Sequence, residues 1–291
     1  MAALIAAQRD GHHIPAAVTC RAPGVSRSWY YKWRGGTLPP RTARREQLRA
    51  GVARLPGVHE GKDGPPRITA GLRDAGWRVS QNTVAGLMAG AGLAARRKKK
   101  RKSATRPGKG RRRAPDLVKR QFPAAGINRR WYGDGTETAA GEGRLYPDPV
   151  PDMASRRVPG FALGGHHDAE LACGALAMAV AVRGGQVPGV LVHTDQGSEY
   201  TAKFFRQACS RPGVTQPAGR PGSAPGNAVI ESWHSTVEWE LRREKTFATR
   251  AGARAGVAAW TGDYNTSRRH SALGMRSPAA YERALATQEA A

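Results

Sequence analysis

The chain has little of several things that would assign it to a familiar class of protein. Its 291 residues include only 3 cysteines, an odd number and widely separated (Cys20, Cys173 and Cys209). This excludes a disulfide framework and a Cys-x-x-Cys metal site. The longest nearly uncharged apolar run, Leu171 to Val182, is far shorter than the roughly 20 residues of a membrane span. We therefore expect reduced thiols, no membrane association and a cytoplasmic location.

Acidic side chains are scarce in the first part of the chain. Residues 1–130 hold 30 Lys or Arg and 6 Asp or Glu, a net charge of +24, whereas residues 131–291 hold 17 and 16, a net charge of +1. Of the 18 residues 96–113, 12 are basic and none is acidic. Such a run repels itself, which predicts an extended linker, and its natural partner is a polyanion because phosphate contacts release counterions. A ribosome-associated or chromatin-like protein shares this feature, but the nearly neutral second part argues against that class.

Three segments follow from the residue patterns. Hydrophobic residues make up 40% of the chain, which is enough to bury a core. Residues 1–95 carry short helical patterns with tight turns, which resemble a helix-turn-helix, and residues 96–123 form the basic linker. From 124 to 285 the pattern predicts an α/β domain. Its expected strands are 130–138, 144–152, 156–163 and 190–193, and its expected helices are 169–182, 201–209 and 227–243.

Three acidic residues lie where an α/β domain places its chemistry. Asp134 is on the first expected strand, and Asp195 directly follows a buried strand. Either one alone would be interpreted as a turn or cap residue. Glu231 is on a helix whose apolar face repeats every fourth residue, so this acid is not needed for packing. Carboxylates from two strands and a helix can hold a pair of Mg²⁺ ions, which clamp the attacking and leaving oxygens of a phosphoryl transfer.

Several motifs resemble those of insertion-sequence transposases of the second-reading-frame type, which have a retroviral-integrase-like core with an Asp-Asp-Glu triad. Residues 193–200 (His-Thr-Asp-Gln-Gly-Ser-Glu-Tyr) resemble the family's second-Asp motif, and residues 227–232 (Asn-Ala-Val-Ile-Glu-Ser) its Glu motif. The 35 residues between Asp195 and Glu231 are the family's spacing. Residues 264–278 resemble its C-terminal signature, and residues 24–28 and 66–68 its N-terminal helical region. The resemblance covers nearly the whole chain.

The resemblance implies a fold, an activity and partners. The fold would be α/β: a ribonuclease-H-like integrase core, with a mixed five-stranded sheet and flanking helices, preceded by a small all-α helix-turn-helix-like region. Asp134, Asp195 and Glu231 would be catalytic and would hold two Mg²⁺ or Mn²⁺ ions. The chain would be a DNA transposase that cleaves element ends and transfers them to target DNA. It would work as a homo-oligomer on DNA, in the nucleoid of a bacterial cytoplasm.

Basic residues in all three segments are expected to bind DNA. Besides these, His193 and His234 are placed to contact DNA or to transfer a proton, although lone histidines are more often structural. The expected DNA-binding residues are Arg27, Arg67, Arg96, Arg97, Lys98, Lys99, Lys100, Arg101, Lys102, Arg111, Arg112, Arg113, Arg268, Arg269 and His270.

Two features depart from the family and support an alternative. Gly133 and Gly135 flank Asp134, which weakens a strand, and the next strand lacks backbone donors because it contains several prolines. At roughly 1 kcal/mol per lost hydrogen bond, the loss is large against a domain stability of ~5–15 kcal/mol. The alternative is a catalytically impaired transposase remnant that acts only as a DNA-binding protein. The prolines concerned are Pro147, Pro149, Pro151 and Pro159.

Overall fold

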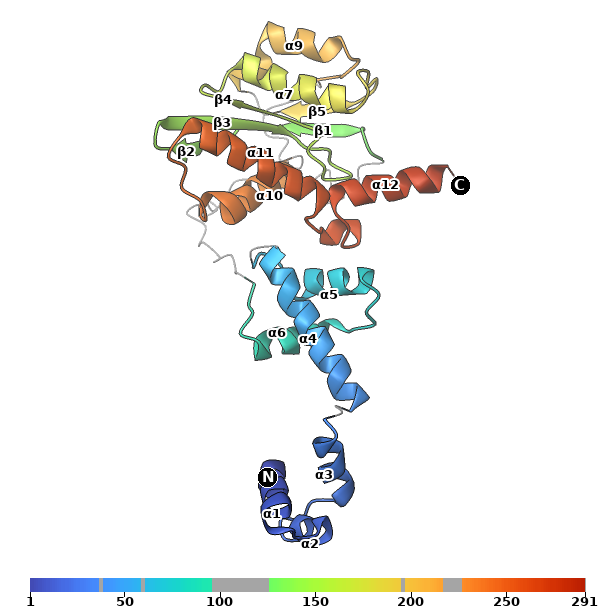
Figure 1. The fold of residues 1–291 in the computed structure, drawn as a ribbon. Coiled ribbons are helices and arrows are strands. Elements are labelled where there is room, and N and C mark those ends of the chain that lie inside the picture. The colour runs from blue at the N-terminus through green and yellow to red at the C-terminus, as the bar shows by residue number, and fades with distance from the viewer. Residues whose placement is uncertain (37–38, 59–60, 96–125, 195–196, 217–226, 291) are drawn as a thin grey trace, which may run out of the picture. The chain divides into compact units, whose positions relative to one another are not determined.

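The chain forms two compact units, Met1–Arg97 and Lys98–Ala291. The computed structural model describes residues 1–36, 39–58, 61–95, 126–194, 197–216 and 227–290 (Figure 1). Where it is described, the first unit contains helices only, and the second unit combines strands and helices. This is the expected α/β fold class with a helical region before it. The expected linker, residues 96–123, lies outside the described residues.

The first three helices share a small core of their own. They are α1 (Ala2–His12), α2 (Ala16–Arg21) and α3 (Arg27–Arg34). Tyr30 is fully buried against Ile5 and Cys20. Ser26 begins α3, because its hydroxyl accepts a hydrogen bond from the backbone N–H of Trp29 and so satisfies a donor that the helix cannot. A tight turn between α2 and α3 matches the helix-turn-helix pattern.

The next three helices form a second helical group with a separate core. They are α4 (Pro40–Val58), α5 (Pro65–Asp74) and α6 (Gln81–Gly90). Ile68, Leu72 and Val84 are buried where these helices meet. The chain leaves α5 through Gly76 at φ 85°, a left-handed conformation that glycine adopts without strain. The Ser80 hydroxyl then caps α6, so a turn joins two short helices as the sequence predicts.

Five strands lie in the described part of the second unit. They are β1 (Arg130–Gly133), β2 (Thr138–Ala140), β3 (Gly143–Val150), β4 (Gly160–Gly164) and β5 (Leu191–Thr194). β1 pairs with β5 in parallel, and β2, β3 and β4 pair antiparallel in that order. A bridge between Trp131 and Asp152 joins the two sets into a mixed arrangement.

Two expected strands have different limits in the structure. The strand expected at 130–138 divides into β1 and β2, because Gly133 and Gly135 hold the extended backbone poorly. The strand expected at 156–163 begins only at Gly160, because residues 152–159 form a loop around the buried Asp152. Both differences concern the neighbourhood of the first strand, where Asp134 lies.

The prolines of β3 do not prevent the strand from forming. In a strand, the N–H and C=O groups of one residue point toward the same neighbouring strand, and those of the next residue point toward the other neighbour. The alternating prolines therefore direct their backbone groups toward one neighbouring strand, and the residues between them toward the other. The carbonyls of Pro147 and Pro151 accept hydrogen bonds from Thr136 (2.8 Å) and Tyr132 (3.1 Å) on the divided first strand. The missing donors therefore face the interrupted β1–β2 stretch, whereas the intervening residues of β3 face β4.

Helices cover both faces of the sheet (Figure 1). One face carries α7 (Ala169–Val182) and α9 (Lys203–Ser210), and the short α8 (Ser198–Thr201) precedes α9; the other carries α10 (Asn227–Val237) and α11 (Arg250–Thr266). α7 approaches β4 closely, since a Cβ at Gly160 would lie 2.7 Å from the Cα of Ala179. No helix in the described ranges is long and apolar enough to span a membrane.

The helix expected at 227–243 changes its winding near its end. It continues from α10 into the π-helix η1 (Glu238–Arg242), then the 3₁₀ turn η2 (Ser271–Leu273) and α12 (Pro278–Glu289) follow α11. In the wider turn of η1, Glu240 is buried and its carboxylate accepts two-pronged hydrogen bonds from Arg268 at 2.9–3.1 Å. α12 is attached to the core through Glu282, which pairs with Arg183 and Arg157, both at 2.6 Å.

Candidate active site

The ends of β1 and β5 lie side by side. Their parallel register pairs Gly133 with Thr194. Each of these residues directly precedes one of the predicted catalytic acids, Asp134 and Asp195. The Asp134 side chain is 31% exposed, whereas Asp195 lies outside the described residues.

The third predicted acid is on α10, with its side chain directed away from the core. The predicted apolar face of this helix is confirmed, since Val229, Trp233 and Val237 are all buried and Glu231 is exposed. One turn after Glu231, His234 places its Nε2 atom 3.3 Å from Oδ2 of Asp134. This contact connects α10 to the end of β1.

The two glycines beside Asp134 are required by close packing. A Cβ at Gly133 would lie 3.2 Å from Cγ2 of Thr194, and one at Gly135 would overlap the ring of His167. The ring of His167 in turn has its Nδ1 atom 3.6 Å from Oε1 of Glu199, which is nearly buried. These glycines weaken the strand, but they also let the ends of β1, β5 and α8 come together.

Burial shifts the pKa values of two other titratable groups near this edge. The hydroxyl of Tyr200 donates hydrogen bonds to both carboxylate oxygens of Asp148 at 3.0 Å. Burial first, and then Asp148, raise the pKa of Tyr200 far above its ordinary value, so it stays protonated. Burial, with a further contribution from Arg130, lowers the pKa of His193, whose ring stacks on Tyr132. A neutral, stacked His193 fits the structural role.

Asp134 and Glu231 are suited to bind a hard divalent cation. Both are carboxylates with access to solvent, and in the described part of the chain neither forms an ion pair with Lys or Arg. Mg²⁺ prefers such oxygen donors and keeps several waters, so few protein ligands suffice. Within the described ranges no group of three or more His, Cys, Asp or Glu makes a complete metal site.

The predicted DNA-binding residues of the first unit differ in how far they are already engaged. Arg27 is exposed at the first turn of α3. Arg67 donates to Asp63 at 3.0 Å and is mostly covered. The others lie outside the described residues, and for them DNA binding stays a prediction: Arg96, Arg97, Lys98, Lys99, Lys100, Arg101, Lys102, Arg111, Arg112 and Arg113.

The predicted DNA-binding residues near the C-terminus lie after α11. Arg268 is held by Glu240 and stacks over the ring of Tyr264 at 5.7 Å, which gives it a structural role. Arg269 donates to the backbone carbonyl of Met275 at 3.0 Å. His270 lines a cavity beside α10. DNA contacts by these three residues stay predictions.

Sequence reasoning missed one arginine that the fold makes prominent. Arg156 was placed at the start of a strand, but it lies in the loop before β4 at φ 61°, a conformation rare for residues other than glycine. Its side chain lines the same cavity as His270. The available signal is Asp152 itself, since an Asp side chain can accept hydrogen bonds from the backbone N–H groups that follow it and so favours a turn.

Family comparisons identify the two parts of the chain. Residues 124–224 and residues 212–278 each match a family described as "Integrase core domain". Residues 44–101 match "HTH-like domain". These matches define an integrase-type enzyme with a helix-turn-helix-like domain before its core.

Curated relatives identify the family more closely. The chain is 32% identical over 266 residues to "Transposase InsF for insertion sequence IS3A" of Escherichia coli K12, which covers 90% of this chain and 92% of that protein. It is 33% identical over 227 residues to "Transposase for insertion sequence element IS904" of Lactococcus lactis, covering 77% and 89%. The chain belongs to the insertion-sequence transposases. The expected family and enzyme class are thereby confirmed, and the non-catalytic alternative is not favoured.

Solved structures show a distant likeness to part of the chain. The HTLV-2 integrase catalytic core in complex with magnesium is 12% identical with a TM-score of 0.39, covering 53% of this chain and 96% of that one. The catalytic core of BIV integrase is 18% identical with a TM-score of 0.41, covering 56% and 97%. Because these scores are low, the family assignment depends on the sequence relatives alone.

Proposed function

We propose that Asp134, Asp195 and Glu231 are the catalytic carboxylates of this transposase, and that they serve metal-dependent cleavage of element ends and transfer of the cut strand to target DNA. The observation that carries the proposal is the register of β1 with β5. Gly133 and Thr194 are partners. The residues that follow two register partners of a parallel pair leave the sheet at the same edge. The contact between His234 and Asp134 supports the inclusion of α10, which carries Glu231.

The donor chemistry of this edge fits a divalent cation. Asp134 and Glu231 have solvent access, which leaves their oxygens available for metal ligation. Two bound Mg²⁺ ions would supply activation of the attacking oxygen and stabilisation of the leaving oxygen in an in-line displacement. His234 lies 3.3 Å from the Asp134 carboxylate, and the glycines beside Asp134 allow the side chains of Thr194, Tyr200 and His167 to approach. That the HTLV-2 integrase core forms a complex with magnesium is consistent with this choice of ion.

We further propose that the basic half of the chain holds the DNA on which the core acts. Its +24 charge and the 12 basic residues between 96 and 113 favour tight, sequence-independent binding to phosphates. α6 offers Gln81, Asn82 and Thr83 at its start, residue types that read base edges in helix-turn-helix proteins. Two copies of the chain, acting on paired element ends in the bacterial nucleoid, would complete the reaction.

A strand-transfer assay tests the catalytic assignment. Purified chain, Mg²⁺ and DNA carrying the element's terminal inverted repeats should give cleaved ends joined to target DNA. We expect Asp134→Asn, Asp195→Asn and Glu231→Gln each to lower the rate at least 10³-fold, since each removes a charge that the metal needs. Glu289→Gln, an exposed acid of α12, is the matched control and should leave the rate unchanged.

The same assay separates the competing function. A wild-type chain that binds the ends but neither cuts nor joins them would favour the DNA-binding remnant, provided that a cooperative unfolding transition shows the protein to be folded. Wild-type activity that survives in all three acid variants would overturn the carboxylate assignment and leave the family assignment intact.

A further inference from the structure

We infer that the cavity lined by Arg156, Ser232, Tyr264 and His270 is a binding site for a backbone phosphate of the DNA strand that the catalytic carboxylates process. The inference rests on the proposed function, because it assigns a place to the DNA. None of these four residues belongs to the carboxylate set. Ser232 lies on α10 and Tyr264 on α11, whereas Arg156 and His270 lie in the segments before β4 and after α11.

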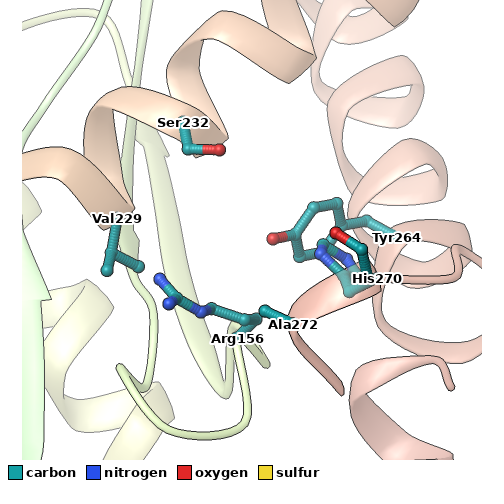
Figure 2. A pocket seen from close by; sticks show the side chains of 7 residues that line it. Arg156, Val229, Ser232, Tyr264, His270 and Ala272 are labelled. Carbon is teal, nitrogen blue, oxygen red and sulfur yellow. The ribbon is translucent and has the colours of Figure 1, made fainter. Parts of the chain in front are cut away.

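The cavity lies between α10, the loop before β4 and the segment that follows α11 (Figure 2). Its volume is about 250 Å³, and it is reached from solvent past the exposed Ser232 and Ser271. This is several times the ~30 Å³ share of a water molecule and smaller than the ~300–1,000 Å³ pockets of drug-sized ligands. A small group, such as a phosphodiester, matches this size.

A rigid loop directs Arg156 into the cavity. The fully buried Asp152 carboxylate accepts hydrogen bonds from the backbone of Asn128 (2.7 Å), Ala154 (2.9 Å) and Ser155 (2.9 Å). The backbone N–H of Arg156 donates to the carbonyl of Asp152 at 2.9 Å. These bonds hold Arg156 at φ 61°, a left-handed conformation that strains a residue with a side chain. Strain of this kind persists where a fixed side-chain direction has a use.

The two consecutive arginines of this loop have different surroundings. Arg157 forms an ion pair with Glu282 at 2.6 Å. For Arg156, no carboxylate of the described residues lies within ion-pair distance, although its side chain is partly buried. Burial lowers the pKa of Arg156, and the hydroxyls of Tyr264 and Tyr132 and the Asp152 carboxylate act against that shift. A guanidinium stays charged in proteins, so its lost hydration leaves it in need of an anionic acceptor.

The other lining groups favour an anion with several oxygens. Ser232 and Tyr264 contribute hydroxyl groups and His270 an imidazole, and Figure 2 shows them around the guanidinium of Arg156. Among the residues that the structure describes, no acidic side chain lines the cavity. Guanidinium groups bind phosphate oxygens in pairs, and hydroxyls can donate to the remaining oxygens.

The position of the cavity favours DNA over a free anion. Ser232 directly follows Glu231 on α10, so the cavity and the predicted catalytic acid lie on adjoining sides of one helix. A phosphate bound by Arg156 would therefore fix the strand next to the carboxylates.

The test compares Arg156→Asn with Arg206→Asn in the full chain. Asn tolerates a left-handed backbone, so the first variant removes the guanidinium without disturbing the loop. Arg206 is an exposed arginine of α9, and its loss controls for a change of one surface charge. The probe is a fluorescently labelled duplex with an element end, titrated over a range of salt concentrations in a buffer without divalent cations.

We expect Arg156→Asn to weaken binding roughly tenfold and to lower the slope of log affinity against log salt by about 0.9, the value for one phosphate contact. Arg206→Asn should change neither quantity. The thermal midpoint of Arg156→Asn should equal or exceed that of the wild type, because a strained and desolvated arginine is removed. A lowered midpoint together with unchanged DNA binding would assign Arg156 a structural role and overturn the inference.

Other outcomes distinguish the site from the proposed function. Equal affinities and slopes for both variants, with wild-type strand transfer intact, would overturn the phosphate site alone. If Arg156→Asn weakens self-association of the chain but not DNA binding, the occupant of the cavity is an acidic group of a second copy. That result would also overturn the phosphate site. If the Arg156 effect on DNA binding is present while the wild type lacks strand transfer, the site stands and the proposed activity fails.

Discussion

At the scale of single residues, Glu282 is a nearly buried carboxylate that two arginines engage. Only 10% of its side chain is exposed, and it accepts hydrogen bonds from Arg183 and Arg157. Burial raises its pKa, but hydrogen bonds from Arg183, Ser155 and Arg157 outweigh burial, so the net pKa lies below the ordinary value. One residue thus joins the last helix, the loop before β4 and the end of α7.

We predict that Glu282→Gln lowers the free energy of unfolding by about 3 kcal/mol at neutral pH, because the nearly buried Arg183 and the partly exposed Arg157 lose their counter-charge. A carboxyl with a lowered folded pKa stabilises the protein above its unfolded pKa, near 4.3, and this stabilisation is lost as the pH falls through the folded value. The difference between wild type and variant should therefore shrink below about pH 4. Denaturant titrations at several pH values measure it, and a difference that does not change with pH would contradict the assignment.

At the scale of elements, the contact between α7 and β4 depends on one glycine. Gly160 faces the backbone of α7 so closely that a Cβ would overlap it, whereas a Cβ at Gly174, on α7 itself, would lie 3.6 Å from Ala162. The second distance is an ordinary van der Waals contact. The two glycines therefore form a matched pair in the same interface.

We predict opposite effects for the two alanine variants. Gly160→Ala should destabilise the protein by roughly 1–3 kcal/mol, because α7 must move away from the sheet. Gly174→Ala should be neutral or stabilising by up to about 1 kcal/mol, since alanine favours a helix and the space is available. Thermal or denaturant unfolding measures both changes. A Gly160→Ala variant as stable as Gly174→Ala would show that α7 packs less closely than described.

The elements differ in how well the sequence predicts them, and the differences have physical causes. The α10 face of Val229, Trp233 and Val237 follows from local periodicity, and the structure buries all three. The division of the first strand and the late start of β4 depend on contacts between distant residues, such as Gly135 against His167. From the sequence alone, the prolines of β3 imply lost hydrogen bonds, because the sequence does not show that they face an interrupted strand. For the same reason Arg156 was missed: its direction comes from the buried Asp152.

At the scale of the whole molecule, charge and chemistry are divided between the two parts of the chain. The +24 part holds the helical region and the linker, and the nearly neutral part holds the predicted carboxylates. Along the sequence, the positive charge that we propose to hold DNA is thus separated from the carboxylates that we propose to bind metal ions. The same division means that DNA affinity and catalytic rate should respond to different substitutions.

We predict that neutralising Lys98, Lys99 and Lys100 to Gln weakens DNA binding and lowers the slope of log affinity against log salt by up to about 2.7, or 0.9 per lost phosphate contact. The matched control neutralises three exposed residues around α9, Lys203, Arg206 and Arg211, and should leave the slope nearly unchanged. Both variants have the same net charge, so a difference between them must come from where the charge lies. At saturating DNA, both should retain the wild-type rate of strand transfer. Equal slopes for the two variants would mean that DNA affinity depends on the net charge alone and not on the position of the charge in residues 96–113.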